Sequence, residues 1–204
     1  MMITCGNSEL DHLLFSSPKV VLVYGPEGSG KTNFALTILR LSRYRRAVYI
    51  STEGSSYVER AEQLSLLDRN DILFANALDL PHLVALTASI PSMGDVDVVI
   101  VDSINYHYRA EVSDVRILRL FATLLSVLRN FVRAQIYVIA TAQVRELEQG
   151  IEPAGMQFLT PWADAIARIE LRKGVRFLIV EKPTYIEIPF RITREGVEWT
   201  LPRF

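Results

Sequence analysis

Short apolar runs alternate with stretches of helical periodicity along most of the chain. The runs that have the length of buried strands lie at residues 20–24, 47–50, 72–75, 96–102 and 136–141. Strands of a parallel sheet are apolar almost throughout, because helices cover both faces of the sheet. The pattern therefore predicts an α/β fold built on a mostly parallel, twisted sheet that is flanked by helices.

The segments between these runs have apolar residues at every third or fourth position, which is typical of amphipathic helices. Helices are predicted over residues 9–14, 31–46, 58–67, 81–89 and 114–133. The first is expected to be capped by Asn7 or Ser8, whose side-chain oxygens can accept hydrogen bonds from the free N–H groups of the first turn. Pro81 suits the start of a helix because it has no N–H group to leave unpaired.

The chain changes character after residue 143. Residues 144–155 are polar and lack periodicity, which predicts a mobile loop. Short strands are predicted at 165–171, 176–181, 186–192 and 197–201, and their short connections favour antiparallel strands that extend the parallel sheet. We expect a single domain over residues 1–204, with a short N-terminal segment at 1–18 and a C-terminal strand extension at 163–204.

The first apolar run leads into a glycine-rich motif that is typical of a phosphate-binding loop. It reads Gly25-Pro26-Glu27-Gly28-Ser29-Gly30-Lys31-Thr32, and a helical pattern follows it. Glycine tolerates positive φ and has no side chain, so the backbone N–H groups of such a turn can close on phosphate oxygens. The helix dipole favours an anion at this point, Lys31 can reach the β- and γ-phosphates, and the Thr32 hydroxyl is placed for Mg²⁺. In this setting the motif predicts a nucleotide-binding P-loop.

Two acidic residues come at the ends of predicted strands. Asp102 closes the run at 96–102, and Glu53 follows the run at 47–50. The carboxyl ends of parallel strands form the edge of the sheet where ligands bind. Asp102 there is a Walker B acid that can hold Mg²⁺ with Thr32, while an aspartate after a strand is also common in turns and helix caps. Glu53 can orient and polarise an attacking water, or it can cap the following helix.

The position of the second acid separates classes of P-loop protein. The residue after Asp102 is Ser103, whereas AAA, ABC and helicase-type motors have a glutamate there. The available carboxylate is that of Glu53, at the end of the strand that follows the P-loop helix. We therefore expect a phosphoryl-transfer site in which Lys31 and Mg²⁺ absorb charge on the phosphate while Glu53 activates water.

Composition limits the partners and the compartment. The net charge is −1 and the pI is near 6.3, whereas a protein that holds nucleic acid over a broad surface normally has a basic excess, so we expect any DNA contact to be local or weak. The basic residues within 40–46 indicate either a nucleic-acid contact or cations that complement a helix C-terminus. No run approaches the roughly 20 apolar residues that cross a bilayer, and the first residues lack a signal-peptide pattern. We expect a cytoplasmic protein with no membrane partner.

Taken together, these motifs resemble the RecA/RadA recombinase ATPase core. The resemblance covers nearly the whole chain and rests on the P-loop and on the residues at 49–54, 59–60, 101–103, 142–144 and 190–198. Residues 101–111 look most like those of an archaeal paralogue of the recombinase. The resemblance implies ATP and Mg²⁺ as cofactors, Glu53 and Lys31 as catalytic groups, and Gln143 as the sensor of the γ-phosphate.

In the same family, two loops face single-stranded DNA. They correspond here to residues 105–113 and 144–155, which makes Arg109, Tyr108 and Arg145 candidate DNA contacts. An aromatic ring such as that of Tyr108 could stack on a base. The second loop departs from the family pattern because its glutamates outnumber Arg145, so its attraction for phosphate should be poor.

These departures shape the expected function. Family filaments use an N-terminal segment to bind the neighbouring ATPase, and only a short segment precedes the first strand here, so we do not expect self-polymerisation. A family ATP site is completed by the next subunit, so a lone copy should hydrolyse ATP slowly. We expect an accessory, or mediator, of the main recombinase or another paralogue in homologous recombination and DNA repair, with weak DNA-dependent ATPase activity. The alternatives are a nucleotide-gated protein-binding module that hardly hydrolyses ATP, and a small-molecule kinase.

Overall fold

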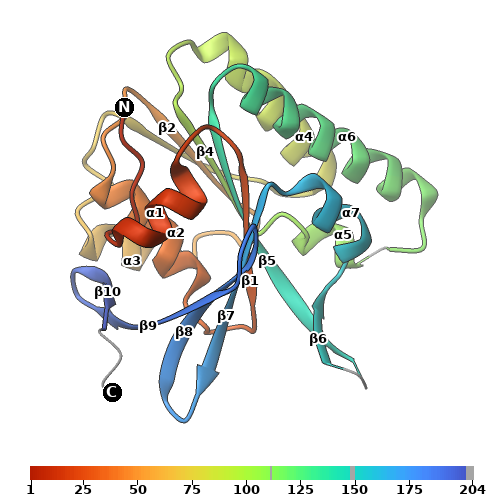
Figure 1. The fold of residues 1–204 in the computed structure, drawn as a ribbon. Helices are drawn as coiled ribbons and strands as arrows, with labels where there is room; N and C mark the ends of the chain where they lie inside the picture. The colour runs from red at the N-terminus through yellow and green to blue at the C-terminus, as the bar shows by residue number, and fades with distance from the viewer. Residues whose placement is uncertain (111, 148–149, 201–204) are drawn as a thin grey trace.

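A ten-stranded sheet runs through the centre of the molecule (Figure 1). The computed structural model describes residues 1–110, 112–147 and 150–200, with only the backbone described at 145–147 and 150–152. The strand order is β10-β9-β8-β7-β1-β5-β4-β2-β3, and β6 pairs with β5 outside this path. The strands are β1 (Val20–Gly25), β2 (Ala47–Ser51), β3 (Ile72–Asn76), β4 (Val98–Asp102), β5 (Tyr137–Leu147), β6 (Gly150–Pro153), β7 (Ala165–Arg172), β8 (Val175–Lys182), β9 (Ile186–Thr193) and β10 (Gly196–Trp199).

The predicted mixed sheet is confirmed. Strands β3, β2, β4, β5, β1 and β7 are parallel neighbours, and antiparallel pairing begins at β8 and continues through β9 to β10. In the parallel part, β1, β2 and β4 are buried along their whole length, which explains their unbroken apolar sequence. The antiparallel strands β8 and β9 are only partly buried, and their sequences mix apolar with polar residues.

Helices cover both faces of the sheet, as Figure 1 shows. They are α1 (Ser8–Phe15), α2 (Lys31–Leu41), α3 (Val58–Gln63), α4 (Leu80–Ser89), α5 (Tyr106–Ala110), α6 (Val115–Arg133) and α7 (Met156–Trp162). Asn7 caps α1 as expected, since its side chain accepts hydrogen bonds from the N–H groups of Glu9 and Leu10. Over the described residues, no helix has both the length and the apolar character required to cross a bilayer.

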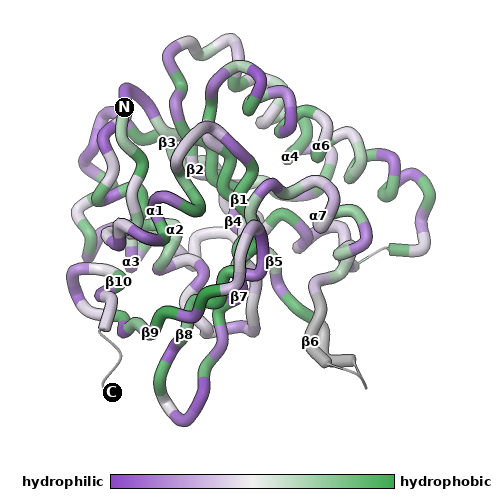
Figure 2. Tube along the Cα trace, viewed as in Figure 1, coloured by the Kyte–Doolittle hydropathy of each residue, from purple (hydrophilic) through white to green (hydrophobic). Residues whose placement is uncertain are grey.

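The sheet separates two hydrophobic cores. Val21 and Val23 of β1 point into the core beneath α1, α2 and α3, while Val20 and Leu22 point into the core beneath α4, α6 and α7. Figure 2 shows hydrophobic and hydrophilic residues alternating along α6, which buries one side and exposes the other. The alternation of side chains along β1 therefore packs this strand against helices on both faces of the sheet.

The structure differs from the predictions at four places. Residues 144–147 and 150–153 are not a loop, because β5 continues and pairs with β6 in a hairpin that projects from the body of the molecule (Figure 1). Backbone hydrogen bonds hold such a hairpin, and the pattern of side chains does not report them. Residues 106–110 form helix α5, and α3 is shorter than predicted because Ser65, with φ of 55°, follows its C-cap in the left-handed region. Helix α7 was not predicted.

Candidate nucleotide-binding site

The P-loop joins β1 to α2 at the edge of the sheet where parallel strands end. Gly28 and Gly30 have φ of 70° and 113°, a region that side-chain-bearing residues rarely adopt. A Cβ atom at Gly25 would lie 2.5 Å from the carbonyl oxygen of Ile169, so only glycine fits where the loop leaves β1. The loop borders a cavity of about 350 Å³ whose other walls come from the ends of β2, β4 and β5.

Lys31 lies inside this loop with 7% of its surface exposed. Its Nζ donates hydrogen bonds to the carbonyl oxygens of Gly25 and Pro26, both at 2.8 Å. Burial lowers the pKa of Lys31, and the negative charges of Asp102, Glu53 and Glu27 partly counteract this effect. The ammonium group is therefore held next to the cavity by two neutral carbonyls, which the oxygens of a charged phosphate can replace.

Asp102 accepts hydrogen bonds from three hydroxyl groups. Thr32 and Tyr49 donate to its Oδ2 atom at 2.7 and 2.5 Å, and Thr141 donates to its Oδ1 atom. A carboxylate beside a threonine hydroxyl, at the mouth of a phosphate-binding loop, is the hard oxygen donor set that Mg²⁺ prefers. The residues present therefore fit a magnesium ion held by Thr32 and, directly or through water, by Asp102.

Tyr49 is a partner of Asp102 that the motif alone does not indicate. Burial and the neighbouring Asp102 raise the pKa of Tyr49 far above its usual value, so its hydroxyl stays protonated and donates at neutral pH.

We expect Tyr49→Phe to raise the Mg²⁺ concentration that gives half-maximal nucleotide binding by roughly tenfold, because the loss of a group that orients a metal ligand usually lowers metal affinity by about this factor. A Mg²⁺ titration of nucleotide binding measures this shift. Tyr44→Phe removes a hydroxyl that bonds the Leu39 carbonyl at 2.9 Å and is the matched control; equal midpoints for both variants would contradict the role.

Glu53 and Ser103 lie side by side on neighbouring strand ends. The Ser103 hydroxyl donates to Oε1 of Glu53 at 3.1 Å. The Thr52 hydroxyl bonds both backbone groups of Ser103, accepting from its N–H at 2.9 Å and donating to its carbonyl at 2.8 Å. Glu53 thus brings a carboxylate from β2 to the place beside Asp102 where Ser103 supplies none.

Gln143 lies in β5 where this strand passes the cavity and its parallel pairing with β1 ends, and 8% of its surface is exposed. In the sheet it is the register partner of Gly25, the first residue of the P-loop. Its backbone N–H and carbonyl both bond the side chain of Asn105, at 3.0 and 2.8 Å. The structure therefore brings Lys31, Thr32, Glu53, Asp102 and Gln143 to one cavity.

Several further residues contribute to the site without having been predicted. Asn33, Ser56 and Arg60 line the cavity. Asn33 Oδ1, Arg60 Nε and, in the predicted P-loop, Ser29 Oγ are buried with no hydrogen-bond partner among the described residues. Arg176 of β8 donates to the Ser29 carbonyl at 3.0 Å and so braces the P-loop from the antiparallel part of the sheet. It is 147 residues away in sequence, and no local pattern could have indicated it.

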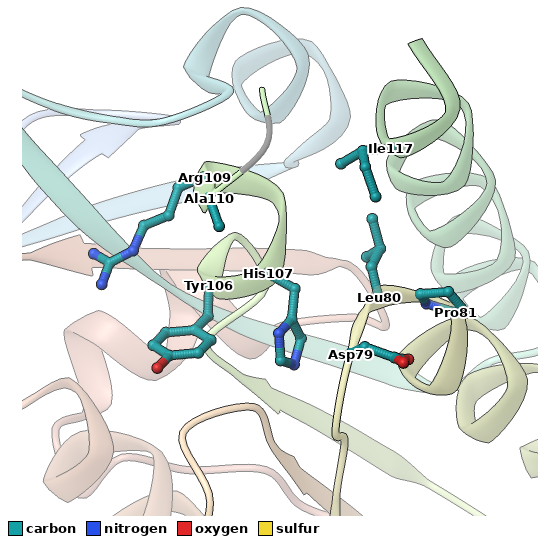
Figure 3. A pocket seen from close by; sticks show the side chains of 8 residues that line it. All are labelled: Asp79, Leu80, Pro81, Tyr106, His107, Arg109, Ala110 and Ile117. Carbon is teal, nitrogen blue, oxygen red and sulfur yellow. The ribbon is translucent and has the colours of Figure 1, made fainter. Parts of the chain in front are cut away.

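The predicted DNA contacts have different outcomes. The prediction that Tyr108 stacks on a base is wrong, because this residue is 3% exposed and lies in the core beneath α6. Its ring stacks on that of Phe121, with 4.2 Å between the ring centroids. The guanidinium of Arg109 lies over the ring of Tyr106, 5.3 Å from its centroid (Figure 3). Arg109 and Tyr106 border a separate cavity of about 560 Å³ between α5 and the start of α4, and no P-loop residue lines this cavity. The side chain of Arg145 lies outside the described residues.

Three of the basic residues at 40–46 make structural contacts. Arg40 pairs with Glu195, and Arg45 pairs with Asp95 and with Asp97 at 2.7 Å. Arg46 donates to the Met93 carbonyl at 2.8 Å. These contacts tie the end of α2 and the start of β2 to neighbouring segments. Helix α2 ends at Leu41, before the predicted residue 46, so of these arginines Arg40 lies in its last turn, where a cation complements the helix dipole.

Comparison with known proteins places this site in a family. Residues 21–155 match the model of the ATPase family associated with various cellular activities (AAA). The chain is 30% identical over 195 residues to the DNA repair and recombination protein RadB of Methanococcus maripaludis strain C5, covering 88% of this chain and 90% of that protein. The chain belongs to the family of the DNA repair and recombination protein RadB. The RadB protein of Methanocaldococcus jannaschii is 29% identical over 196 residues, covering 88% of this chain and 92% of that protein.

The fold agrees with the same family. A crystal structure of the RadB recombinase superposes with a TM-score of 0.77 at 28% identity, covering 96% of this chain and 98% of that one. The expected resemblance to an archaeal recombinase paralogue with a RecA-like core is thus confirmed. The P-loop, the Walker B aspartate and strands β2 to β6 lie within the segment that matches the ATPase model, and β1 begins one residue before it. The match to the ATPase model supports a nucleotide-binding core in this chain.

Proposed function

We propose that the chain binds ATP and Mg²⁺ and acts in DNA repair and homologous recombination as an accessory to a main recombinase or another paralogue. The observation that carries the proposal is the single cavity onto which Lys31, Thr32, Glu53, Asp102 and Gln143 converge. Membership of a family whose relatives are named for DNA repair and recombination supports the cellular role.

Each side chain has a distinct task in the proposed reaction. Lys31 exchanges the carbonyls of Gly25 and Pro26 for phosphate oxygens, and Gln143 donates its amide to the γ-phosphate. Glu53, held by Ser103, orients a water molecule in line with the phosphorus and takes its proton. Thr32 and Asp102 would hold Mg²⁺, which supplies charge neutralisation at the β- and γ-phosphates.

The cavity lining supports slow turnover. Among the described residues that line it, Lys31 and Arg60 are the cations. Two nitrogens of the Arg60 guanidinium bond groups away from the P-loop, the Thr193 carbonyl at 2.5 Å and the Gln63 side chain at 2.9 Å, while its Nε atom has no hydrogen-bond partner among the described residues. Fast P-loop hydrolysis usually needs an arginine that reaches the transferred phosphate. Since the P-loop residue Lys31 is the cation placed to bind the phosphates, we expect a weak ATPase.

The accessory role is supported by the residues at the predicted DNA-binding loops, which are poorly suited to bind DNA. Tyr108 is packed inside the core, and the residues at 144–155 include more glutamates than arginines. Of the predicted contacts, Arg109 has a side chain that lies outside the core. We therefore expect the contact with DNA to be local. Strand exchange requires a continuous grip on the phosphate backbone, which this distribution of charge does not favour.

Binding of labelled single-stranded DNA tests the proposal. We expect weak binding that strengthens when an unhydrolysable ATP analogue and Mg²⁺ are present. With about two phosphate contacts, a roughly fourfold rise in salt should weaken binding by roughly sevenfold. Binding that ignores both nucleotide and salt would contradict a phosphate contact and would favour a protein-binding module instead.

A further inference from the structure

Asn105 is a fully buried polar side chain between the end of β4 and the start of α5. Its amide accepts a hydrogen bond from the Gln143 N–H at 3.0 Å and donates to the Gln143 carbonyl at 2.8 Å. It also donates to the Ala154 carbonyl at 3.2 Å. Each polar atom of this amide therefore has a backbone partner, and two of the three bonds hold one residue.

The side chain takes the place of a missing strand. Strand β4 pairs with β5 only as far as Val101 and Ala140, and the N–H of Ile104 then bonds the Thr141 carbonyl at 2.8 Å. Beyond that point the Asn105 amide makes the two hydrogen bonds to the Gln143 backbone that a neighbouring strand would otherwise make. On the other side of β5, Gly25 of the P-loop is the register partner of Gln143. Gln143 is thus fixed between the P-loop and Asn105.

The third bond closes the base of the β5–β6 hairpin. Val144 is the register partner of Pro153, so Gln143 and Ala154 are the next residues outward from that pair, and Asn105 bonds both. The returning chain is held close at the following residue as well, because a Cβ atom at Gly155 would lie 2.9 Å from the Tyr108 ring. A shift of the Gln143 backbone would therefore break its two bonds to Asn105, whose side chain is also held by the Ala154 carbonyl.

We propose that Asn105 is a positioning residue that aims the Gln143 side chain at the γ-phosphate and thereby sets the preference for triphosphate over diphosphate nucleotides. The inference rests on the proposed ATP-binding function and deepens it. Asn105 touches neither the nucleotide nor Mg²⁺ in this scheme; it acts through the backbone of Gln143. ADP lacks the γ-phosphate, so its affinity does not depend on this bond.

The affinities of ADP and of an unhydrolysable ATP analogue, each with Mg²⁺, test the inference by titration calorimetry. In Asn105→Leu, which keeps the size but loses all three bonds, we expect the preference for the triphosphate to fall by about tenfold, the usual value of one hydrogen bond to a charged group. ADP affinity should stay within about twofold of the wild type. Gln143→Ala should lose the same preference, and the double variant should lose no more than either single one.

A purely structural role is separated by two further variants. Tyr137→Phe, at the opposite end of β5, removes a buried hydroxyl that bonds the Phe15 carbonyl at 3.1 Å and should lower stability without changing the preference. Asn105→Asp keeps the acceptor for the Gln143 N–H and replaces the Asn105→Leu variant if that does not fold. An unchanged preference in a folded Asn105 variant would overturn the inference. Failure of the wild type to bind either nucleotide would instead overturn the proposed function.

Discussion

Lys31→Ala is expected to abolish nucleotide binding. The ammonium group is the buried cation of the P-loop, and its removal takes away charge-assisted bonds to the phosphates, each worth roughly 1.5–3 kcal/mol. Two such bonds correspond to a loss of affinity of at least about a hundredfold. Titration with a fluorescent ATP analogue in the presence of Mg²⁺ measures the change.

Lys19→Ala is the matched control for this experiment. Lys19 lies just before the opposite end of β1, where its Nζ bonds the Leu13 carbonyl at 3.2 Å and the Ser16 hydroxyl at 3.1 Å. The same substitution there should leave nucleotide affinity unchanged, while circular dichroism checks that both variants fold. Normal affinity in a folded Lys31→Ala variant would remove the basis of the site assignment.

Glu53→Gln is expected to leave ATP binding intact and to slow hydrolysis by about 10²- to 10⁴-fold, the usual contribution of a general base. Glutamine keeps an acceptor for the Ser103 hydroxyl, so the geometry around Asp102 should survive while the ability to take a proton from water is lost. Release of inorganic phosphate under single-turnover conditions reports the chemical step.

Glu27→Gln separates the loss of the base from the loss of charge. Glu27 lines the same cavity and also helps to keep Lys31 protonated, but it belongs to the P-loop rather than to a strand end. We expect its hydrolysis rate to stay within a few-fold of the wild type. If Glu53→Gln hydrolyses ATP as fast as Glu27→Gln, Glu53 is not the base. If Glu53→Gln supports repair as well as the wild type does, hydrolysis is dispensable and the nucleotide acts as a switch.

The strand ends illustrate how far the sequence leads to the site. Asp102, Glu53 and Gln143 are scattered over ninety positions, yet each follows an apolar run, and the parallel sheet predicted from those runs places all three ends at one edge. The structure brings them to one cavity with the P-loop. Periodicity and strand direction were sufficient because each of these residues is positioned by its own strand.

The contacts that hold these residues could not be predicted in the same way. Tyr49 and Thr141 are ordinary strand residues in sequence, and their hydroxyls meet Asp102 only because β2 and β5 flank β4. Tyr108 has the same local signal as an aromatic residue exposed to bases, and its packing on Phe121 depends on where α6 crosses the sheet. The backbone pairing of β5 with β6 likewise leaves no mark on the side-chain pattern.

The sequence by itself determined the class of fold, the phosphate-binding loop and the acids at the strand ends, because each depends on residues that are neighbours in the chain or on the direction of a single strand. Only the tertiary structure decided which groups orient those acids, how Asn105 and Arg176 brace Gln143 and the P-loop, and which aromatic residues are buried. The reason is that a hydrogen bond or a packed ring between distant segments depends on the strand order and helix placement, to which every part of the chain contributes.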